Sequence, residues 1–511
     1  MPTHEPIPFS RLLEPLRAAG LLVDAAGDTQ TPIDALAHDS RRVEPGTCFF
    51  AISGAQADGH LFLDKAVQHG ATAAVCERPP EADLPGLAAV ARVTDARAAL
   101  AEAAGVFFGR PSQALRLAGI TGTNGKTTTA FLLHHLLQSL GETAGLIGTV
   151  EVRIGAEALT ATHTTPDALE LNRLLRRMAD AGCTACAMEV SSHALEQERV
   201  RGQRFAAAVF TNLTHEHLDY HGTFEAYRAA KAKLFDSLGA DATAVVNRDD
   251  PNWDAMVGGT SARVVTYGAA SGAGPADVRF GILDNRLDGL RLRLDGAERR
   301  FRLAGTFNAY NLAAAYATAR ALGYAQPETL DALAEAPPVP GRLETIRAEG
   351  GPIAVVDYAH TPDALENVLR TVREMKPEGG RVLCVFGCGG DRDRQKRPVM
   401  GRIAEALADR VVLTNDNPRT EGPEQILREI QGGMERPDAA AVVTDRAAAI
   451  RQAVSESAAG DVVVVAGKGH ETYQVIGRDT RHFDDREVVR QAFAARIFRR
   501  ETTPDPDTRA D

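Results

Sequence analysis

The sequence predicts an α/β protein of about three domains, and three observations support this. The chain has 511 residues, and a domain typically holds about 150. Near its middle, an apolar strand, a glycine-rich loop and an amphipathic helix follow one another. In the C-terminal third, helical stretches alternate with four strand-like runs, at residues 353–356, 382–386, 411–414 and 462–466. Such alternation is typical of a parallel sheet that binds ligands beyond the carboxyl ends of its strands.

Loop signals predict the domain boundaries. The first domain, residues 1–111, contains a predicted strand at 47–52 and a predicted helix at 62–69, and it ends in the loop Phe108-Gly-Arg-Pro-Ser112. The central domain, 112–337, ends at Pro337-Pro-Val-Pro-Gly341, because clustered prolines cannot continue a helix or a central strand. The third domain covers 338–500. Residues 501–511 are polar and interrupted by proline, so we expect a mobile tail there.

Composition excludes several classes of function. The 57 Lys and Arg residues against 68 Asp and Glu give a net charge of −11, which argues against binding to nucleic acid. No apolar run is long enough to span a bilayer, and the start of the chain lacks the pattern of a secretory signal. Six scattered cysteines fit reduced thiols, so we expect a cytoplasmic protein, with Cys183 and Cys186 buried and inert.

The strongest motif is Gly119-Ile-Thr-Gly-Thr-Asn-Gly-Lys-Thr-Thr128. Its glycines allow backbone N–H groups to surround phosphate oxygens, Lys126 can reach the β- and γ-phosphates, and the Thr127 hydroxyl can ligate magnesium. The motif departs from the strict P-loop pattern, because Ile120 stands where that pattern has its first glycine. In the helix that follows, we expect His134 and His135 at the surface.

Three further segments of the central domain carry polar groups. Glu189-Val-Ser-Ser-His193 follows an apolar run and suits a magnesium ligand or a simple helix cap. The segment from Thr211 to His221 is rich in His and carboxylates, and from its residues alone a solvated loop and a metal site are equally supported. The predicted helix from Tyr227 to Phe235 carries two lysines, at positions 231 and 233, which alone indicate a solvated face.

In the C-terminal domain, polar loops follow the predicted strands and could converge on one crevice. Arginine forks bind carboxylates, whereas carboxylates hold an ammonium group, so this mixture of charges fits an amino-acid-like ligand. Each loop taken singly is equally consistent with an ordinary polar surface. The four loops are Asp357-Tyr-Ala-His-Thr-Pro362, Gly387-Cys-Gly-Gly-Asp-Arg-Asp-Arg394, Asp416-Asn-Pro-Arg419 and Gly467-Lys-Gly-His-Glu471.

Taken together, the motifs resemble the Mur ligase family over essentially the whole chain, and most closely its members that add meso-diaminopimelate. One departure is Glu216, which stands before His217 where the familiar form has Asp. The matching segments, in family order, are Asp39-Ser-Arg41, Gly122-Thr-Asn-Gly-Lys-Thr-Thr128, Thr164-Thr-Pro-Asp167, Glu189-Val-Ser-Ser-His193, His217-Leu-Asp219, Ala230-Lys-Ala232, Phe307-Asn-Ala-Tyr-Asn311, Gly341-Arg342, Asp357-Tyr-Ala-His360 and Asp416-Asn-Pro-Arg419.

The resemblance implies a three-domain architecture with an N-terminal domain for a uridine nucleotide, a central P-loop ATPase domain and a C-terminal Rossmann-like domain. It implies Lys126, Lys231 and His217 as catalytic residues and a magnesium site made by Thr127, Glu189, His217 and Lys231, the lysine as a carbamate formed with CO₂. The implied ATP-binding residues are Gly122, Thr123, Asn124, Gly125, Lys126, Thr127, Thr128, Asn308, Arg342 and Asp357. Those for the UDP-linked substrate are Ser40, Ala55, Gln56, Ala57, Thr164, Thr165, Ser191, Gln197 and Arg199. Those for the amino acid are Arg392, Asp416, Asn417, Pro418, Arg419, Gly467 and Glu471.

The activity implied is that of an ATP-dependent amide ligase. It would join meso-diaminopimelate to the D-Glu of UDP-N-acetylmuramoyl-L-Ala-D-Glu through an acyl phosphate, in peptidoglycan precursor synthesis, and we expect it to act as a monomer. Three alternatives remain at this stage: a lysine-adding ligase, a ligase like folylpolyglutamate synthase, and a P-loop ATPase that does not ligate. Asp416-Asn-Pro-Arg419 and the N-terminal nucleotide signature favour the diaminopimelate ligase.

Overall fold

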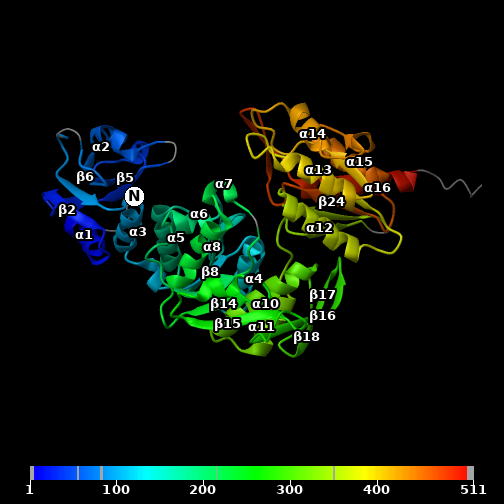
Figure 1. Cartoon of the computed structure of the whole chain (residues 1–511), viewed down its shortest axis with the longest axis horizontal. Helices are drawn as coiled ribbons and strands as arrows, with labels where there is room; N and C mark the ends of the chain where they lie inside the picture. The colour runs from blue at the N-terminus through cyan, green and yellow to red at the C-terminus, as the bar shows by residue number, and fades with distance from the viewer. Residues whose placement is uncertain (1–4, 55–56, 81–83, 215, 349–350, 503–511) are drawn as a thin grey trace, which may run out of the picture. The chain divides into compact units, whose positions relative to one another are not determined.

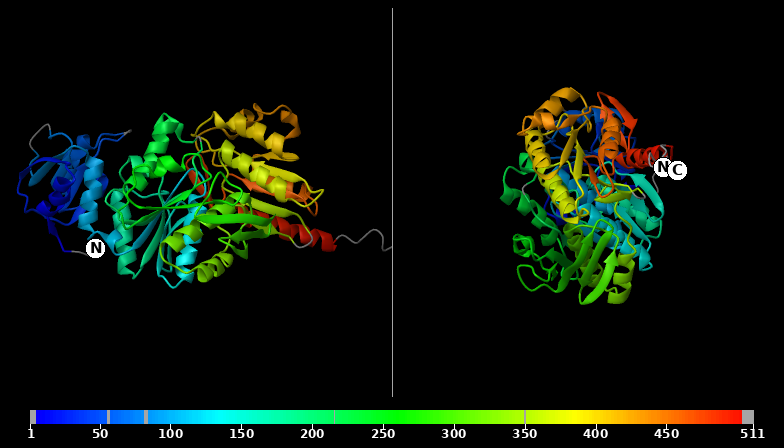
Figure 2. Two further views of the ribbon diagram at one scale, coloured as in Figure 1. Left: turned by 60° about the horizontal axis from the view of Figure 1, so that its bottom comes forward. Right: turned by 90° about the vertical axis from the view of Figure 1, so that its right-hand side faces the viewer.

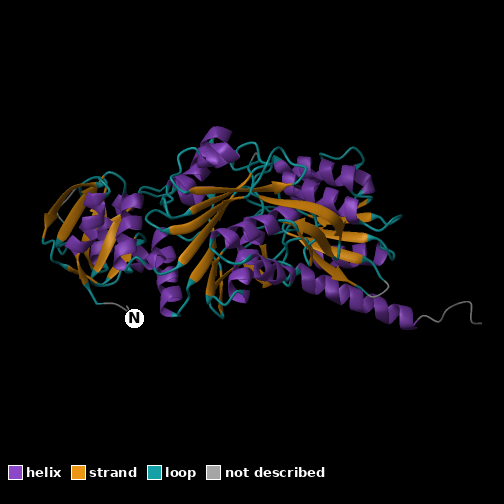
Figure 3. Cartoon of the chain, turned by 90° about the horizontal axis from the view of Figure 1, so that it is seen from below, coloured by secondary structure: helices purple, strands orange, loops and turns teal. Residues whose placement is uncertain are grey.

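The structure is a computed structural model that describes residues 5–54, 57–80, 84–214, 216–348 and 351–502. The described residues form two compact units (Figure 1), one within Met1–Arg279 and Tyr310–Ala332 and the other within Phe280–Ala309 and Leu333–Asp511. Each unit contains β-sheet with helices packed against it, which confirms the predicted α/β class (Figure 3). Ala55, Gln56 and residues 503–511 of the predicted tail lie outside the described residues.

The N-terminal part of the first unit is built on a five-stranded sheet. Its order is β2 (Leu22–Gly27), β7 (Ala89–Val93), β6 (Ala71–Cys76), β5 (Thr47–Ala51) and β4 (Ala35–Ala37), and only β2 is antiparallel to its neighbour. A separate pair joins β1 (Ile7–Pro8) to β3 (Pro32–Ile33). The helices are α1 (Phe9–Ala18), α2 (Leu63–Gln68), α3 (Ala96–Phe107) and the 3₁₀ turns η1 (Ser40–Arg42), η2 (Gly59–Phe62) and η3 (Pro111–Gln113). The strand β5 and the helix α2 confirm the two elements predicted here.

The larger part of the first unit is built on parallel strands. Their order is β9 (Ala144–Ile147), β12 (Ala185–Glu189), β8 (Arg116–Thr121), β13 (Phe205–Phe210), β14 (Thr243–Asn247) and β15 (Arg263–Ala269), with β10 (Glu151–Ile154) and β11 (Glu157–Thr160) added antiparallel beyond β9. The helices are α4 (Lys126–Ser139), α5 (Ala168–Asp180), α6 (Ser192–Glu196), α7 (Leu218–His221), α8 (Phe224–Asp236) and α9 (Trp253–Val257). The strands β8, β12 and β13 are almost wholly buried, as expected for parallel strands covered on both faces.

The expectation that His134 lies at the surface was wrong. His134 is only 4% exposed, and its Nδ1 lies 3.2 Å from the carbonyl oxygen of Gly145 on β9. Helix α4 packs against both β9 and β12, so His134 occupies a face of the helix that meets the sheet. Burial lowers the pKa of His134 to about 4, which keeps its imidazole neutral.

The second unit begins with an antiparallel ribbon of β16 (Val278–Arg286), β17 (Gly289–Leu294) and β18 (Ala297–Phe301). In the chain, α10 (Thr306–Ala321) and α11 (Gln326–Ala334) follow this ribbon, and residues Tyr310–Ala332, which make up most of both helices, belong to the first unit. The main sheet has the order β19 (Glu344–Arg347), β20 (Ile353–Asp357), β24 (Val462–Ala466), β21 (Val382–Phe386), β22 (Arg410–Leu413) and β23 (Ala441–Val442), all parallel except β19. Strands β20, β21, β22 and β24 confirm the four predicted runs.

Helices and one hairpin complete the second unit. The helices are α12 (Pro362–Met375), α13 (Lys396–Leu407), α14 (Pro423–Gln431), the 3₁₀ turn η4 (Pro437–Ala439), α15 (Arg446–Glu456) and α16 (Asp485–Thr502). The hairpin is β25 (Tyr473–Ile476) with β26 (Asp479–His482). Helix α16, red in Figure 2, includes Glu501 and Thr502, which were assigned to the tail.

All six cysteines are free thiols and buried, as predicted for Cys183 and Cys186. Burial raises the pKa of both thiols, so they remain protonated and unreactive at neutral pH. In the described ranges, no helix is long and apolar enough to cross a membrane.

Candidate active site

The glycine-rich loop lies between β8 and α4, at the carboxyl end of the strand. Gly122 has a φ of 149° and Gly125 a φ of 88°, and a Cβ on Gly122 would overlap the Thr211 hydroxyl. Glycine is therefore required at position 122. The chain after β13 fixes the loop, because the Thr123 N–H donates to the Asn212 carbonyl at 2.8 Å and the Asn124 N–H donates to the Asn212 side chain at 2.9 Å. The loop and the start of α4 form the geometry that binds phosphate.

Two lysines meet at this loop. Lys126, the first residue of α4, donates from Nζ to the carbonyl oxygens of Gly122 at 2.9 Å and Thr123 at 2.8 Å. Lys231, on α8, donates to the same Gly122 oxygen at 2.7 Å and is only 1% exposed. Burial lowers the pKa of Lys231 well below its ordinary value, and the charge of Lys126 lowers it further. The view of the α8 lysines as a solvated face was therefore wrong for Lys231, although Lys233 is exposed and paired with Glu196 at 2.9 Å.

Glu189 lies at the end of β12 and is 1% exposed. Its carboxylate accepts hydrogen bonds from the Thr127 hydroxyl at 2.9 Å and from the backbone N–H of Thr149 at 2.7 Å. The structure thus places the two predicted oxygen ligands of a cation, Glu189 and Thr127, in contact. Oxygen ligands of this kind suit Mg²⁺.

His217 is the residue before α7, in the left-handed region with a φ of 58°. Its ring centroid lies 6.0 Å from that of Tyr227, whose hydroxyl contacts Thr123 Oγ1 at 3.0 Å and whose ring lies under Lys231 Nζ at 4.6 Å. Tyr227 therefore links His217 to the phosphate loop and to Lys231. Across the described part of the chain, no three His, Cys, Asp or Glu side chains form a group that could hold a metal.

Four of the residues proposed for the UDP-linked substrate form one hydrogen-bonded group, and a fifth, Thr164, is bonded to Thr149. The Thr165 hydroxyl accepts from the Ser191 N–H at 3.0 Å, and the Thr165 carbonyl accepts from Arg199 at 2.8 Å. Arg199 also donates to Gln197 at 2.7 Å, and Thr149 donates to Thr164 at 3.0 Å. Ser40 and Ala57 lie in the N-terminal sheet region, where Ser40 belongs to η1 and is buried.

The remaining ATP candidates lie in the second unit. Asp357, at the end of β20, accepts backbone N–H groups of Leu343 at 2.7 Å and Ala359 at 2.8 Å, and burial raises its pKa. The Arg342 guanidinium lies 4.7 Å from the ring centroid of Tyr358. Asn308 is buried and donates to the carbonyl of Ala304 at 2.7 Å.

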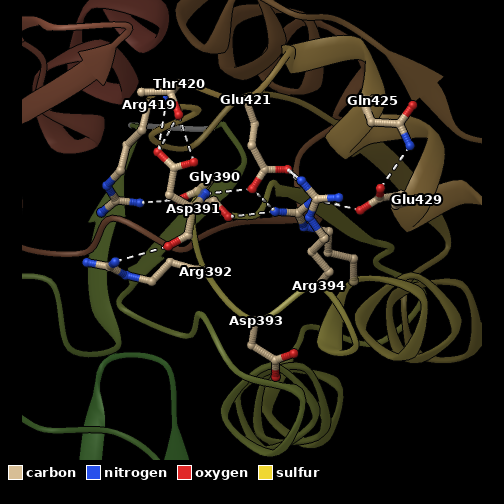
Figure 4. Close-up of polar contacts among 12 residues, drawn as sticks. Gly390, Asp391, Arg392, Asp393, Arg394, Arg419, Thr420, Glu421, Gln425 and Glu429 are labelled. Carbon is tan, nitrogen blue, oxygen red and sulfur yellow. Dashed lines mark hydrogen bonds and ion pairs between the residues drawn. The ribbon is translucent and has the colours of Figure 1, made fainter. Parts of the chain in front are cut away.

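The residues proposed for the amino acid converge in the second unit, at the carboxyl ends of β21, β22 and β24. Asn417 donates to Glu471 at 2.9 Å, and the Arg419 guanidinium donates to the Gly390 carbonyl at 2.8 Å. Gly467 has a φ of 118°, and its Cβ would lie 2.7 Å from Asp416 Oδ2. Arg392 donates to the Asp391 carbonyl at 3.1 Å, on the loop after β21 that also carries Gly390 (Figure 4). Pro418 stands between Asn417 and Arg419 in the same loop.

Lys468 is a residue of this group that the sequence analysis missed. It is fully buried and donates to Asn417 at 3.1 Å and Glu471 at 2.9 Å. Lys468 lies between Gly467 and Gly469 in the motif Gly467-Lys-Gly-His-Glu471, which was already selected from the sequence. This position was the signal that could have identified Lys468 as a site residue. The site therefore contains two arginines, a buried ammonium and two carboxylates, which is the charge mixture expected for an amino-acid ligand.

Comparison with known proteins assigns the chain to a family. Three family models match it: "Mur ligase family, catalytic domain" over residues 32–108, "Mur ligase middle domain" over 120–319 and "Mur ligase, glutamate ligase domain" over 341–469. The chain belongs to the Mur ligase family. This confirms the resemblance and the three-domain α/β architecture predicted from the motifs of the sequence.

Two relatives of this Mur ligase and one similar solved structure carry the same name. It is 45% identical over 472 residues to the UDP-N-acetylmuramoyl-L-alanyl-D-glutamate–2,6-diaminopimelate ligase of Cytophaga hutchinsonii, which covers 92% of this chain and 96% of that protein. It is 46% identical over 475 residues to the ligase of the same name from Geobacillus kaustophilus, covering 91% and 95%. A solved structure of a UDP-N-acetylmuramoyl-L-alanyl-D-glutamate–2,6-diaminopimelate ligase is similar with a TM-score of 0.68 and 35% identity, covering 96% of this chain and 99% of that one.

Proposed function

We propose that this Mur ligase joins meso-diaminopimelate to the D-Glu residue of UDP-N-acetylmuramoyl-L-Ala-D-Glu, with ATP converted to ADP and phosphate. The observation that carries the proposal is the loop Asp416–Arg419, which lies beside Glu471 and Arg392 and combines cationic and anionic groups. The relatives named for this reaction support it along more than nine-tenths of the chain.

The first chemical step is phosphoryl transfer. The side-chain carboxylate of D-Glu attacks the γ-phosphorus of ATP, a C–O–P linkage forms, and the bond from that phosphorus to the β–γ bridging oxygen breaks to release ADP. Lys126 and the N–H groups of the loop from Gly122 to Gly125 surround the phosphates and offset their negative charge. In the second step the diaminopimelate amine attacks the acyl carbon, phosphate leaves from the tetrahedral intermediate, and the nitrogen loses its proton.

Magnesium and a carbamate complete the proposed site. Thr127, Glu189, His217 and Lys231 would hold the metal, Lys231 as the carbamate formed with CO₂, and magnesium would supply charge neutralisation at the phosphates. The buried contact between Thr127 and Glu189 and the burial of the Lys231 amine are the observations that fit this set. An uncharged amine is the form that reacts with CO₂, and burial favours this form.

Substrate selection follows from the chemistry of the pocket. Diaminopimelate differs from lysine by one extra carboxylate, and an arginine fork that loses its carboxylate partner pays a large desolvation cost. Arg392 and Arg419 are the proposed partners of substrate carboxylates, and Asp416 and Glu471 are the proposed partners of an ammonium group.

The group around Thr165 and Arg199, with Ser40 and the loop containing Ala57, is proposed to bind the UDP-linked substrate. We further propose that the enzyme acts in the cytoplasm, as a monomer.

A phosphate-release assay that omits one component at a time tests this function. We expect release to require ATP, UDP-N-acetylmuramoyl-L-Ala-D-Glu and meso-diaminopimelate together. Release that continues without both co-substrates would indicate a P-loop ATPase that does not ligate. Release that needs a folate and glutamate instead would indicate a ligase like folylpolyglutamate synthase.

A further inference from the structure

Two loops carry the arginines of the proposed amino-acid site, and a network of charged side chains joins them. One loop, residues 387–395, follows β21, and the other, residues 414–422, follows the neighbouring strand β22. The Gly390 N–H donates to the Asn417 carbonyl at 2.9 Å, and Arg419 donates back to the Gly390 carbonyl at 2.8 Å. A Cβ on Gly390 would overlap the Pro418 carbonyl, so the two backbones approach as closely as glycine allows.

Acidic side chains complete the junction between the loops. The Asp391 carboxylate accepts from the Thr420 hydroxyl at 2.8 Å and from the Thr420 N–H at 3.1 Å. In the opposite direction, the Asp391 N–H donates to Glu421 Oε1 at 2.6 Å. Figure 4 shows the Asp391 and Glu421 carboxylates between the two loops, with Arg392 and Arg419 on the side of Asp391 away from Glu429. Asp391 and Glu421 therefore join the loops in both directions, because the carboxylate of each accepts a hydrogen bond from the loop that carries the other.

Arg397 donates hydrogen bonds to both loops at this junction. It lies in the first turn of α13, its side chain is fully buried, and its guanidinium makes a two-pronged contact with Glu421 at 2.9 and 3.0 Å. It also donates to the Gly389 carbonyl at 3.2 Å and to Glu429 at 2.6 Å. The Arg397 hydrogen bonds lower the pKa of Glu421 to about 2, so Glu421 is ionised at neutral pH. Bidentate pairs of this kind fix geometry as well as charge.

The loops need such a restraint because each contains a residue in an unfavourable backbone conformation. Asp391 has a φ of 53° and Arg419 a φ of 52°, and non-glycine residues reach this left-handed region only at an energetic cost. The hydrogen bonds at the junction involve these two residues directly. Loss of the Glu421 carboxylate removes the acceptor of the Asp391 N–H and loosens the loop that carries Arg392, whereas the Arg419 backbone keeps its hydrogen bonds to Val475 and Gly477. The distance between Arg392 and Arg419 would change as a result.

We propose that Glu421, held by Arg397, is a positioning residue that sets the distance between Arg392 and Arg419 and so determines selectivity for an amino acid with a second carboxylate. This rests on the proposed function, in which those arginines bind the carboxylates of diaminopimelate. Glu421 touches neither substrate nor reacting atoms in this proposal. Its effect is therefore confined to amino-acid binding and should not extend to ATP.

The test compares Glu421→Gln with Glu429→Gln. Both variants remove one carboxylate from Arg397. Among the contacts described, Glu421 also accepts from the Asp391 N–H at 2.6 Å and pairs with Arg394 at 2.9 Å, whereas Glu429 contacts neither residue. Because small displacements of binding groups cost large factors, we expect Glu421→Gln to raise the KM for meso-diaminopimelate about tenfold or more, with the KM for ATP within about twofold of wild type. The ratio of kcat/KM for meso-diaminopimelate over L-lysine should fall by about the same factor. Glu429→Gln should change neither quantity.

Three results would overturn the inference: an unchanged KM for diaminopimelate in Glu421→Gln, a parallel rise in the KM of all three substrates, or the same change in Glu429→Gln. If Glu421→Gln does not fold, Glu421→Asp replaces it, since it keeps the charge but shortens the side chain that accepts from the Asp391 N–H. A smaller rise in the same KM, about threefold, is then expected, and no rise would reject the proposal. If the wild-type enzyme does not use diaminopimelate, the proposed function itself is refuted. Failure of the proposed function is thus distinguished from failure of the inference about Glu421.

Discussion

Lys126 and Lys231 donate to one acceptor, the carbonyl oxygen of Gly122, at 2.9 and 2.7 Å. Two ammonium groups on one oxygen repel each other, and Lys231 is buried, so the geometry favours an uncharged amine at Lys231. Reaction of that amine with CO₂ forms an N–C bond and releases a proton, which converts an uncharged amine into an anion that attracts Lys126. The shared carbonyl is thus the structural basis for the proposed carbamate.

The variant Lys231→Ala tests the proposed carbamate directly. We expect turnover to fall by at least about a hundredfold, because an oxygen ligand that offsets phosphate charge is lost. Short carboxylates such as acetate should restore part of the activity by occupying the space of the missing carbamate. Lys233→Ala, two residues along the same helix, removes only the exposed pair with Glu196 and serves as the control. Wild-type activity in Lys231→Ala would contradict the account.

Gly122→Ala tests the phosphate loop. The added Cβ would overlap the Thr211 hydroxyl at a φ of 149°, so the loop must move. We expect the KM for ATP to rise by about a hundredfold, since binding requires the N–H groups in place. The control is Gly141→Ala, after the end of α4, where φ is 91° but no atom lies within 4 Å of the Cβ. Gly141→Ala should lower stability by about 1 kcal/mol and leave the KM for ATP unchanged. If Gly122→Ala and Gly141→Ala change the KM for ATP equally, the steric overlap at Gly122 is not the cause of weaker ATP binding.

The buried pair of Arg446 and Asp485 anchors the amino-acid site to the second unit. Both side chains are fully buried, with a contact of 2.7 Å, and Arg446 also donates to the carbonyls of Asn415 at 3.3 Å and Ala466 at 3.0 Å, just before Asp416 and Gly467. Asp485→Asn leaves a buried guanidinium without its counter-charge, so we expect a loss of about 3–5 kcal/mol in the free energy of unfolding.

Chemical denaturation, monitored by a spectroscopic signal from the second unit, measures this loss in the free energy of unfolding. The control is Glu366→Gln, which breaks the exposed pair with Arg370 on α12 and should cost no more than about 0.5 kcal/mol. A loss in Asp485→Asn as small as in this control would show that the buried pair does not stabilise the unit.

The sequence analysis was most successful where local pattern determines structure. Runs such as 382–386 and 462–466 are apolar, β-branched and bounded by polar or glycine residues, and both form strands at the stated positions. The phosphate loop was found because its glycines, Lys126 and Thr127 are adjacent in the chain. The loop Asp416-Asn-Pro-Arg419 was selected because polar residues follow a predicted strand there, the family resemblance implied its role, and the structure places it beside Glu471.

Residues whose role depends on distant partners were not found in this way. Arg397 and Arg446 appear as ordinary helical cations in the sequence, because Glu421 and Asp485 that bury them lie far along the chain. From its helix alone, Lys231 was interpreted as part of a solvated face, and it was the family resemblance that implied a catalytic role. Tyr227, Lys231 and Leu234 share one side of the helix and are all buried, so their helical spacing was a signal in the sequence for this burial.

Selection of an amino acid with two carboxylates can be measured in a single experiment. Phosphate release by the wild-type enzyme, with ATP and UDP-N-acetylmuramoyl-L-Ala-D-Glu, is measured as a function of meso-diaminopimelate and of L-lysine concentration. The account predicts a kcat/KM for meso-diaminopimelate at least about a thousandfold above that for L-lysine, since lysine leaves an arginine of the pocket without a partner. Equal or faster release with L-lysine would contradict it.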